Sequence, residues 1–167
     1  IFLDILRLIA DLLGYFHFTD TMTTSYSETT KSIAEEAATM VDVSRLDSFV
    51  ESNGTSPEFI ETHDFFDTLC NKMDAEFIYI VFVADDFSKV NFICEAVNEK
   101  SPFDEFPVNF ELSVTEGEYI QYGKCFRDII ENNKDSEFVI QNKGNIETGY
   151  HISSVVSLRD EAGEIKA

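Results

Sequence analysis

The sequence predicts an α+β fold in which long N-terminal helices pack behind a five-stranded antiparallel sheet. Three observations predict this class. Segments with helical spacing occupy most of residues 1–73, two dense β-forming runs follow at 76–98, and three more β-forming segments close the chain after one further helix. A length of 167 residues with 44 % hydrophobic content suits one core, so we expect a single domain with a helical extension.

Residues 1–18 are strongly apolar and predict the first helix. Asp4, Arg7 and Asp11 fall at helical spacing, which places them on one narrow stripe. Three charges so close together disfavour a membrane-spanning segment. We assign residues 1–24 to a juxtamembrane or dimerisation helix, with an ordinary buried helix as the alternative.

A run rich in Ser and Thr at 19–27 predicts a break or bend, after Gly14 or near Asp20, because these residues are weak helix formers. Helical spacing then returns through residue 41. This second helix packs on its own sheet or on a twin from another chain, and both readings stay open. Its expected apolar seam consists of Met22, Tyr26, Thr29 or Thr30, Ile33, Ala37 and Met40.

Two more helices are predicted before the first strand. A short one covers 45–51, and the Asn-Gly-Thr sequence at 53–55 breaks the chain after it. A longer one covers about 57–72, because Ser56 can cap its start and Pro57 suits its first turn.

The middle of the chain predicts an antiparallel hairpin. Residues 76–83 form a dense β-forming run, and 90–98 form the next strand after a short turn. Residues 101–117 have no sustained periodicity and predict a long irregular connection. A helix at 119–133 and a strand at 137–141 follow.

The C-terminal stretch reads as a β-hairpin. Its first arm is 149–158, its loop is 159–163 with Gly163 suited to a positive φ, and its second arm is 164–167. A strand rarely ends at its fourth residue, so we expect residues 25–167 to be one domain truncated at its C-terminal strand.

Segments 33–42, 77–81 and 149–163 follow one another in this order along the chain. Together they resemble the Cache-type sensor domains, which are PAS-like and extracellular, and the resemblance covers residues 25–167 as a single Cache-like sensor domain. The resemblance implies a PAS/Cache-like sheet and the extracytoplasmic ligand-sensing domain of a bacterial membrane receptor, of the histidine kinase, diguanylate cyclase or chemoreceptor type. The motif of the family's amino-acid-binding members is not found in this sequence, so the resemblance does not imply that the ligand is an amino acid. The alternative is an intracellular PAS-like dimerisation module without a specific ligand.

The charge of the chain limits its partners. A net charge of −20, from 32 acidic and 12 basic residues, opposes binding to nucleic acid, which needs clustered Lys and Arg. The same field favours neutral, zwitterionic or cationic small molecules. We expect no cofactor, a membrane-anchored parent chain, and a possible homodimer through the N-terminal helices.

Catalytic and metal chemistry are weakly supported. Cys70, Cys94 and Cys125 are far apart and lack a C-x-x-C pair, so they predict buried thiols rather than a zinc site. A hydrolase would need Ser153 or Cys94 beside one of the histidines, His17, His63 or His151, and no nucleophile-elbow pattern surrounds any Ser. The Asp85-Asp86 pair lacks the spacing of a calcium loop, so we predict no metal site.

A ligand site is expected where one face of the sheet meets the connection at 101–122. Tyr150 and His151 must point to opposite faces of their strand, so they cannot both line it. Arg127 and Lys124 are the nearby cations able to meet a ligand carboxylate. The candidate ligand-binding residues are Tyr79, Cys94, Tyr122, Arg127, Tyr150, His151 and Ser153.

Overall fold

The computed structural model describes residues 2–141 and 151–167, with the side chains of 2–18 and of residue 118 left undescribed. The predicted turn at 142–145 lies outside the described residues. The elements are α1 (Phe2–Thr39), η1 (Val43–Arg45), α2 (Leu46–Glu51), α3 (Pro57–Met73), β1 (Phe77–Val83), β2 (Lys89–Val97), β3 (Phe110–Ser113), η2 (Gly117–Tyr119), α4 (Ile120–Glu131), β4 (Ser136–Gln141) and β5 (His151–Val156).

The first helix is continuous, so the predicted break near residue 20 is wrong. The side chains of the Ser- and Thr-rich stretch bond to the carbonyl groups of the preceding helical turn instead of interrupting it. Ser27 Oγ donates to Thr23 O at 2.9 Å, and Thr29 Oγ1 donates to Ser25 O at 2.9 Å. Local hydrogen bonding thus makes this polar stretch compatible with one long helix.

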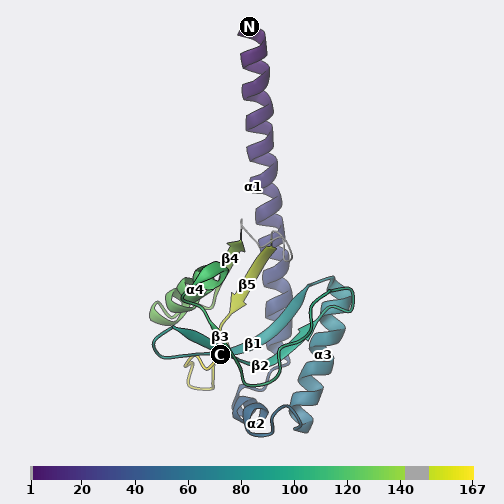
Figure 1. Cartoon of the computed structure of the whole chain (residues 1–167), viewed down its shortest axis with the longest axis vertical. Helices are drawn as coiled ribbons and strands as arrows, with labels where there is room; N and C mark the ends of the chain where they lie inside the picture. Colours follow the sequence, from purple (N-terminus) through teal and green to yellow (C-terminus); the bar gives the residue numbers. More distant parts are fainter. Residues whose placement is uncertain (1, 142–150) are drawn as a thin grey trace.

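Only the C-terminal part of α1 packs on the domain. The N-terminal part projects away from the other elements as a single helix (Figure 1). Ile33 and Ala37 of the predicted seam are buried, while Met22, Tyr26 and Met40 are exposed at 36 %, 56 % and 45 %. Of the seam residues, Ile33 and Ala37 therefore contribute to the core of the domain, whereas Met22, Tyr26 and Met40 do not. No helix within the described residues is long and apolar enough to cross a bilayer.

The predicted single five-stranded sheet is wrong. Within the described residues, β1, β2 and β3 form one antiparallel sheet, and β4 and β5 form a second. One strand, β3, comes from the connection that was predicted to be irregular, and it pairs with β2. The expected last strand is reduced to one isolated bridge between Arg159 and Ile165. Periodicity marks where strands occur, but the pairing of their edges is a tertiary property that it does not encode.

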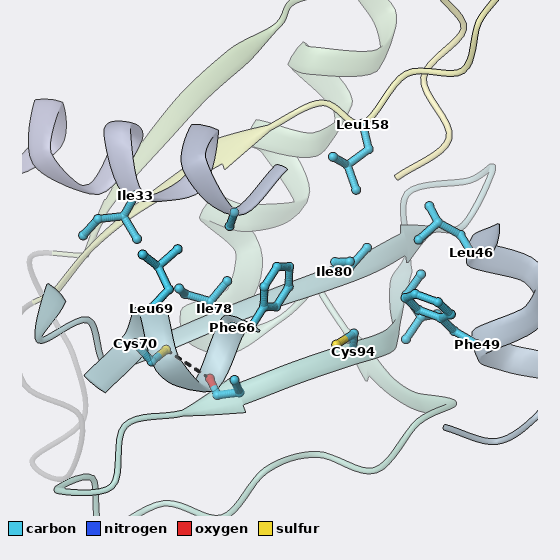
Figure 2. Close-up of a cluster of buried hydrophobic side chains, with 13 residues drawn as sticks. Ile33, Leu46, Phe49, Phe66, Leu69, Cys70, Ile78, Ile80, Cys94 and Leu158 are labelled. Atoms are coloured by element: carbon cyan, nitrogen blue, oxygen red, sulfur yellow. Dashed lines mark hydrogen bonds between the residues drawn. The ribbon is translucent and has the colours of Figure 1, made fainter. Parts of the chain in front are cut away.

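The hairpin of β1 and β2 confirms the predicted antiparallel pair and separates two cores. A bulge lies where the register shifts between Ile80 and Val81. Ile78 and Ile80 face one core, which α1, α2 and α3 complete (Figure 2). Val81 faces the other core, which α4 and β4 complete. The hairpin thus has α1, α2 and α3 packed on one side and α4 on the other.

The predicted helices at 45–51 and 57–72 are confirmed closely. At the start of α3, Ser56 Oγ accepts a hydrogen bond from Phe59 N–H at 3.2 Å, and Pro57 occupies the first turn. The helix ends at Met73, and the next residue, Asp74, caps it in the left-handed conformation with φ of 55°. Cys70 of α3 donates from Sγ to Ala96 O at 3.5 Å, which ties the helix to β2 (Figure 2).

Arg159 holds the closing turn of the chain. Its guanidinium donates to the carbonyl oxygens of Asn133 at 3.1 Å, Lys134 at 3.0 Å and Gly163 at 3.0 Å. Because these acceptors belong to two separate turns, one side chain joins the segment after α4 to the segment after β5. Gly163 has a φ of 82°, as its predicted turn role requires.

Candidate functional site

Three of the predicted ligand-binding residues meet between α4 and β5. The hydroxyl of Tyr122 lies 2.7 Å from Ser153 Oγ and 3.1 Å from His151 Nε2. Tyr122 is buried, whereas His151 and Ser153 are partly exposed. His151 and Ser153 are two residues apart on one strand, so they share the face that α4 covers. We call Tyr122, His151 and Ser153 the polar trio.

The hydrogen bonds of the polar trio can exchange. A tyrosine hydroxyl has one hydrogen to donate, so Tyr122 cannot donate to Ser153 and to His151 at the same time. When it donates to one of them, it can accept from the other. His151 keeps its second ring nitrogen, and Ser153 keeps unused hydrogen-bonding capacity. These groups are therefore able to bind a polar ligand at the rim of α4 and β5.

Tyr79 lies beside the polar trio in the same core as Tyr122. Its ring packs against Phe92 at a centroid distance of 5.3 Å. Burial, with smaller contributions from Tyr122 and Glu95, raises the pKa of Tyr79 well above its ordinary range. Its hydroxyl is therefore neutral at physiological pH.

Glu95 is a polar residue of this face that the sequence reasoning missed. It pairs with Tyr79 across β1 and β2, is 6 % exposed, and accepts a hydrogen bond from Phe106 N–H at 2.5 Å. Burial, helped by Glu105 and opposed by the Phe106 hydrogen bond, raises the pKa of the Glu95 carboxyl to about 7. The available signal was one acid inside the otherwise apolar run at 92–97, since an unpaired charge is rarely buried.

The opposite face of β5 contacts α1. Ser154 Oγ lies 2.6 Å from Thr30 Oγ1 and donates to Ser27 O at 3.4 Å. Successive side chains of a strand point to opposite faces. Strand β5 therefore touches α4 through His151 and Ser153 and touches the long helix through the residue next to them.

The other predicted site residues lie elsewhere. Cys94 is buried in the core on the α1 and α3 side, away from Tyr122. The guanidinium carbon of Arg127 lies 4.6 Å from the centroid of the Phe87 ring, and its Nη1 lies 3.7 Å from Glu131 Oε1. Arg127 therefore belongs to the outer surface of α4. Tyr150 lies outside the described residues.

The thiols do not form a reactive centre. Cys70, Cys94 and Cys125 are free and buried, which confirms the expectation for these residues. Burial raises the pKa of each thiol to about 12. Because the thiolate is the nucleophilic form, these side chains are poorly suited to covalent chemistry.

The connection over the sheet packs with aromatic side chains. Phe103 lies 5.9 Å from Phe77, and Phe106 lies 4.9 Å from Phe92, between ring centroids. Phe106 also stacks on Phe110 at 4.3 Å. The part of the β1–β2–β3 sheet that lies toward residues 103–110 is thus covered by aromatic rings.

Comparison with known proteins gives no match. No protein-family model, curated protein or solved structure shows significant similarity to this chain. The resemblance to Cache-type domains stays a prediction made from three short segments.

Proposed function

We propose that this chain is the ligand-sensing module of a bacterial membrane receptor, acting on the extracytoplasmic side and binding a small molecule beside the polar trio. The observation that carries the proposal is the double role of β5. His151 and Ser153 contact Tyr122 on α4, and Ser154 contacts Thr30 on α1. One strand thus connects a set of exchangeable polar groups to the helix that projects from the domain.

This connection suggests how binding is reported. A ligand that hydrogen-bonds to Ser153 or His151 competes with the Tyr122 hydroxyl and favours a different position of β5 relative to α4. Any shift of β5 acts on the contact between Ser154 and Thr30, and through it on α1. A ligand moves such an equilibrium only by its difference in affinity for the two arrangements.

The charge of the chain narrows the ligand class. A net charge of −20 disfavours an anionic ligand unless basic groups surround the site. Arg127, the predicted partner of a ligand carboxylate, lies on the outer surface of α4 beside Glu131 and Phe87. The polar trio itself supplies hydroxyl and imidazole groups. These features favour a neutral, zwitterionic or cationic ligand.

A dimerisation module without a specific ligand is the second candidate. It is favoured by Met22 and Tyr26, which are exposed at 36 % and 56 % on α1. Both belong to the predicted apolar seam, and they precede the buried residues Ile33 and Ala37 in the sequence of α1. A second copy of α1 would cover them.

A thermal-shift screen tests the proposal, because a ligand that binds the folded state raises the unfolding temperature. The panel contains amino acids, organic acids, amines, sugars, nucleobases and divalent cations. The matched variants are Ser153→Ala in the polar trio and Ser113→Ala, which is exposed on β3. We expect a dose-dependent rise in Tm for one class, with a dissociation constant weakened about tenfold in Ser153→Ala, equivalent to one lost hydrogen bond, and unchanged in Ser113→Ala.

Two results would contradict the sensor proposal. A shift that is equal in both variants places the ligand away from the polar trio. An absence of any shift, together with a concentration-dependent dimer in analytical ultracentrifugation, assigns the chain to the dimerisation class instead.

A further inference from the structure

The connection between β2 and β3 covers a part of β2 that β3 does not reach. Strand β3 pairs with residues 89–92 of β2. Glu95 lies beyond this pairing and is nevertheless 6 % exposed. Phe106 of the connection donates its N–H to Glu95 Oε2 at 2.5 Å. The connection thus lies over a buried carboxyl group of the sheet.

Residues 102–108 of this connection are anchored at both ends. Before them, Ser101 Oγ donates to Glu76 Oε1 at 2.6 Å. After them, Asn109 N–H donates to Phe92 O at 2.8 Å. We call residues 102–108 the strap.

The middle of the strap is held by few interactions. The strap contains no helix or strand, and Pro102 and Pro107 have no N–H to donate. Within the described residues, the N–H of Phe106 is the one backbone donor of the strap that bonds to the sheet. The Phe106 side chain is 37 % exposed, although its ring packs against two other phenylalanine rings. The position of the strap therefore depends on the bond to Glu95.

Glu95 is buried without a compensating cation. No basic side chain in the described part of the chain acts on it, whereas Glu105, an acid of the strap itself, does. Tyr79 of β1 and the thiols of Cys70 and Cys94 also interact with Glu95, but their raised pKa values keep them uncharged at neutral pH. Burial and the like charge of Glu105 both disfavour a carboxylate at this position. Ionisation of Glu95 therefore costs free energy while the strap is closed.

His63 of α3 contacts the strap from the outside. Its Nε2 lies 3.1 Å from Glu105 Oε2, and the two groups form an ion pair when the imidazole is protonated. A proton on His63 therefore holds the strap in place, as a proton on Glu95 does. Both groups favour the closed strap at lower pH.

We infer that the strap is a pH-dependent lid, closed over Glu95 while this carboxyl is protonated and lifted when the carboxyl ionises. Lifting admits water to the carboxylate and moves Glu105 away from it, so both costs of the ionised form are relieved. The bond from Phe106 N–H is replaced by bonds to water, and the Phe92 ring beneath Phe106 is uncovered. The strap operates without any ligand at the polar trio.

The direction of the pH dependence follows from the protons bound in each form. The pKa of Glu95 is about 7 with the strap closed, against an ordinary value of 4.5, which we expect once the strap is lifted. Between these pH values the closed form keeps a proton that the lifted form has released. The equilibrium constant for lifting therefore rises by up to about tenfold per pH unit from about 4.5 to about 7, and it stays high above that range.

Fluorescence quenching by acrylamide tests the lid. The chain contains no tryptophan, so the single indole of Phe106→Trp reports on the strap alone. Phe103→Trp takes its place if the Phe106→Trp indole is already fully quenched at pH 5. We expect the quenching constant to rise at least about twofold from pH 5 to pH 8, while the far-UV circular dichroism stays unchanged. With the same reporter, the rise is expected to disappear in Glu95→Gln and to remain in Glu111→Gln, the matched control on β3.

Four results would overturn the lid. A quenching constant that is equal at pH 5 and pH 8 means that the strap does not lift. A rise that persists in Glu95→Gln assigns the pH dependence to another group, and its loss in His63→Gln would identify the imidazole. Loss of the rise in both Glu95→Gln and Glu111→Gln means a general effect of charge. A rise that accompanies loss of the circular dichroism signal reports unfolding of the domain instead of movement of the strap.

Discussion

Thr30 Oγ1 lies 2.6 Å from Ser154 Oγ, which joins the long N-terminal helix to the last described strand across 124 positions of sequence. Ser154 also donates to Ser27 O at 3.4 Å, one helical turn away. The neighbouring residue Ser153 contacts Tyr122 on the other side of β5. Because β5 contacts both α1 and α4, a movement of this strand would change both contacts.

The Thr30→Val substitution tests this link. Valine keeps the shape of the side chain but removes the hydroxyl. Ser154 therefore loses its hydrogen bond with residue 30. We expect the free energy of unfolding to fall by about 1 kcal/mol in urea titrations. If the sensor proposal holds, ligand affinity changes little, while ligand-induced changes in hydrogen exchange along 23–34 are reduced.

Thr29→Val is the matched control. Thr29 Oγ1 donates to Ser25 O within its own helix, and the side chain is exposed. The same substitution there removes a helical hydrogen bond but no contact with β5. Equal effects of the two substitutions on stability and on exchange would contradict the role of the Thr30 contact.

The Tyr122→Phe substitution tests the polar trio. It removes the hydroxyl that contacts Ser153 at 2.7 Å and His151 at 3.1 Å and leaves the buried ring in place. We expect a loss of about 1–2 kcal/mol in the free energy of unfolding, since the partners lose hydrogen bonds in a partly buried place. Tyr26→Phe, at an exposed position of α1, is the control and should have almost no effect. Equal stability of the two variants would show that the trio contributes nothing to the fold.

The buried carboxyl of Glu95 predicts a pH dependence of stability. Its pKa is about 7 in the folded protein, against an ordinary value of 4.5. Between these pH values the unfolded chain has released a proton that the folded protein keeps. The contribution of Glu95 to the free energy of unfolding therefore falls as pH rises from about 4.5 to about 7, by at most about 3 kcal/mol, and stays low above that range.

Glu95→Gln removes this titration and retains an oxygen to accept from Phe106 N–H. Urea unfolding at pH 5 and pH 8 measures the effect. We expect the substituted protein to gain stability relative to the unsubstituted one as the pH is raised. Glu111→Gln is the control. Glu111 lies on β3, and its side chain is 59 % exposed. A difference between pH 5 and pH 8 that is the same for both variants would rule out Glu95 as its source.

Among the arginines whose side chains the structure describes, Arg159 is predicted to contribute most to stability. Arg159→Ala removes hydrogen bonds to three carbonyl oxygens, which we expect to cost about 2–3 kcal/mol of the free energy of unfolding. The ion pair with Asp135 adds little, because that carboxylate is 91 % exposed. Arg127→Ala, on the exposed surface of α4, should cost less than 1 kcal/mol. Thermal or urea unfolding that ranks the two variants equally would contradict this assignment.

Much of the secondary structure was readable from the sequence because its signals are local. Ser56 and Pro57 predict the start of α3, and the dense run at 76–83 predicts β1, since capping and β-propensity depend on neighbouring residues. The break predicted in α1 failed on the same local level. Propensity counts Ser and Thr as weak helix formers but does not count the hydroxyl-to-carbonyl bonds that accommodate them within the helix.

The candidate site was predicted in part. Three of the predicted residues come together, because His151 and Ser153 of β5 both contact Tyr122. Cys94 and Arg127 were grouped with them because of their residue types, yet the bulge-containing hairpin turns Cys94 into the other core. The surface of α4 turns Arg127 outward. Which face a residue occupies depends on register and packing, which residue type does not reveal.

Local signals in the sequence were enough to predict the α+β class, the positions of most helices and strands, the burial of the three thiols, and a charge that disfavours nucleic acid. Folding adds what these signals do not contain: the described strands form two sheets, β3 pairs with β2, and an apolar groove lies between β1 and β5. The fold also brings Thr30 to Ser154 and buries Glu95 beside Tyr79. The physical reason is that propensity, capping and alternation act between near neighbours in the chain. Edge pairing and desolvation depend instead on segments that become neighbours only when the chain folds.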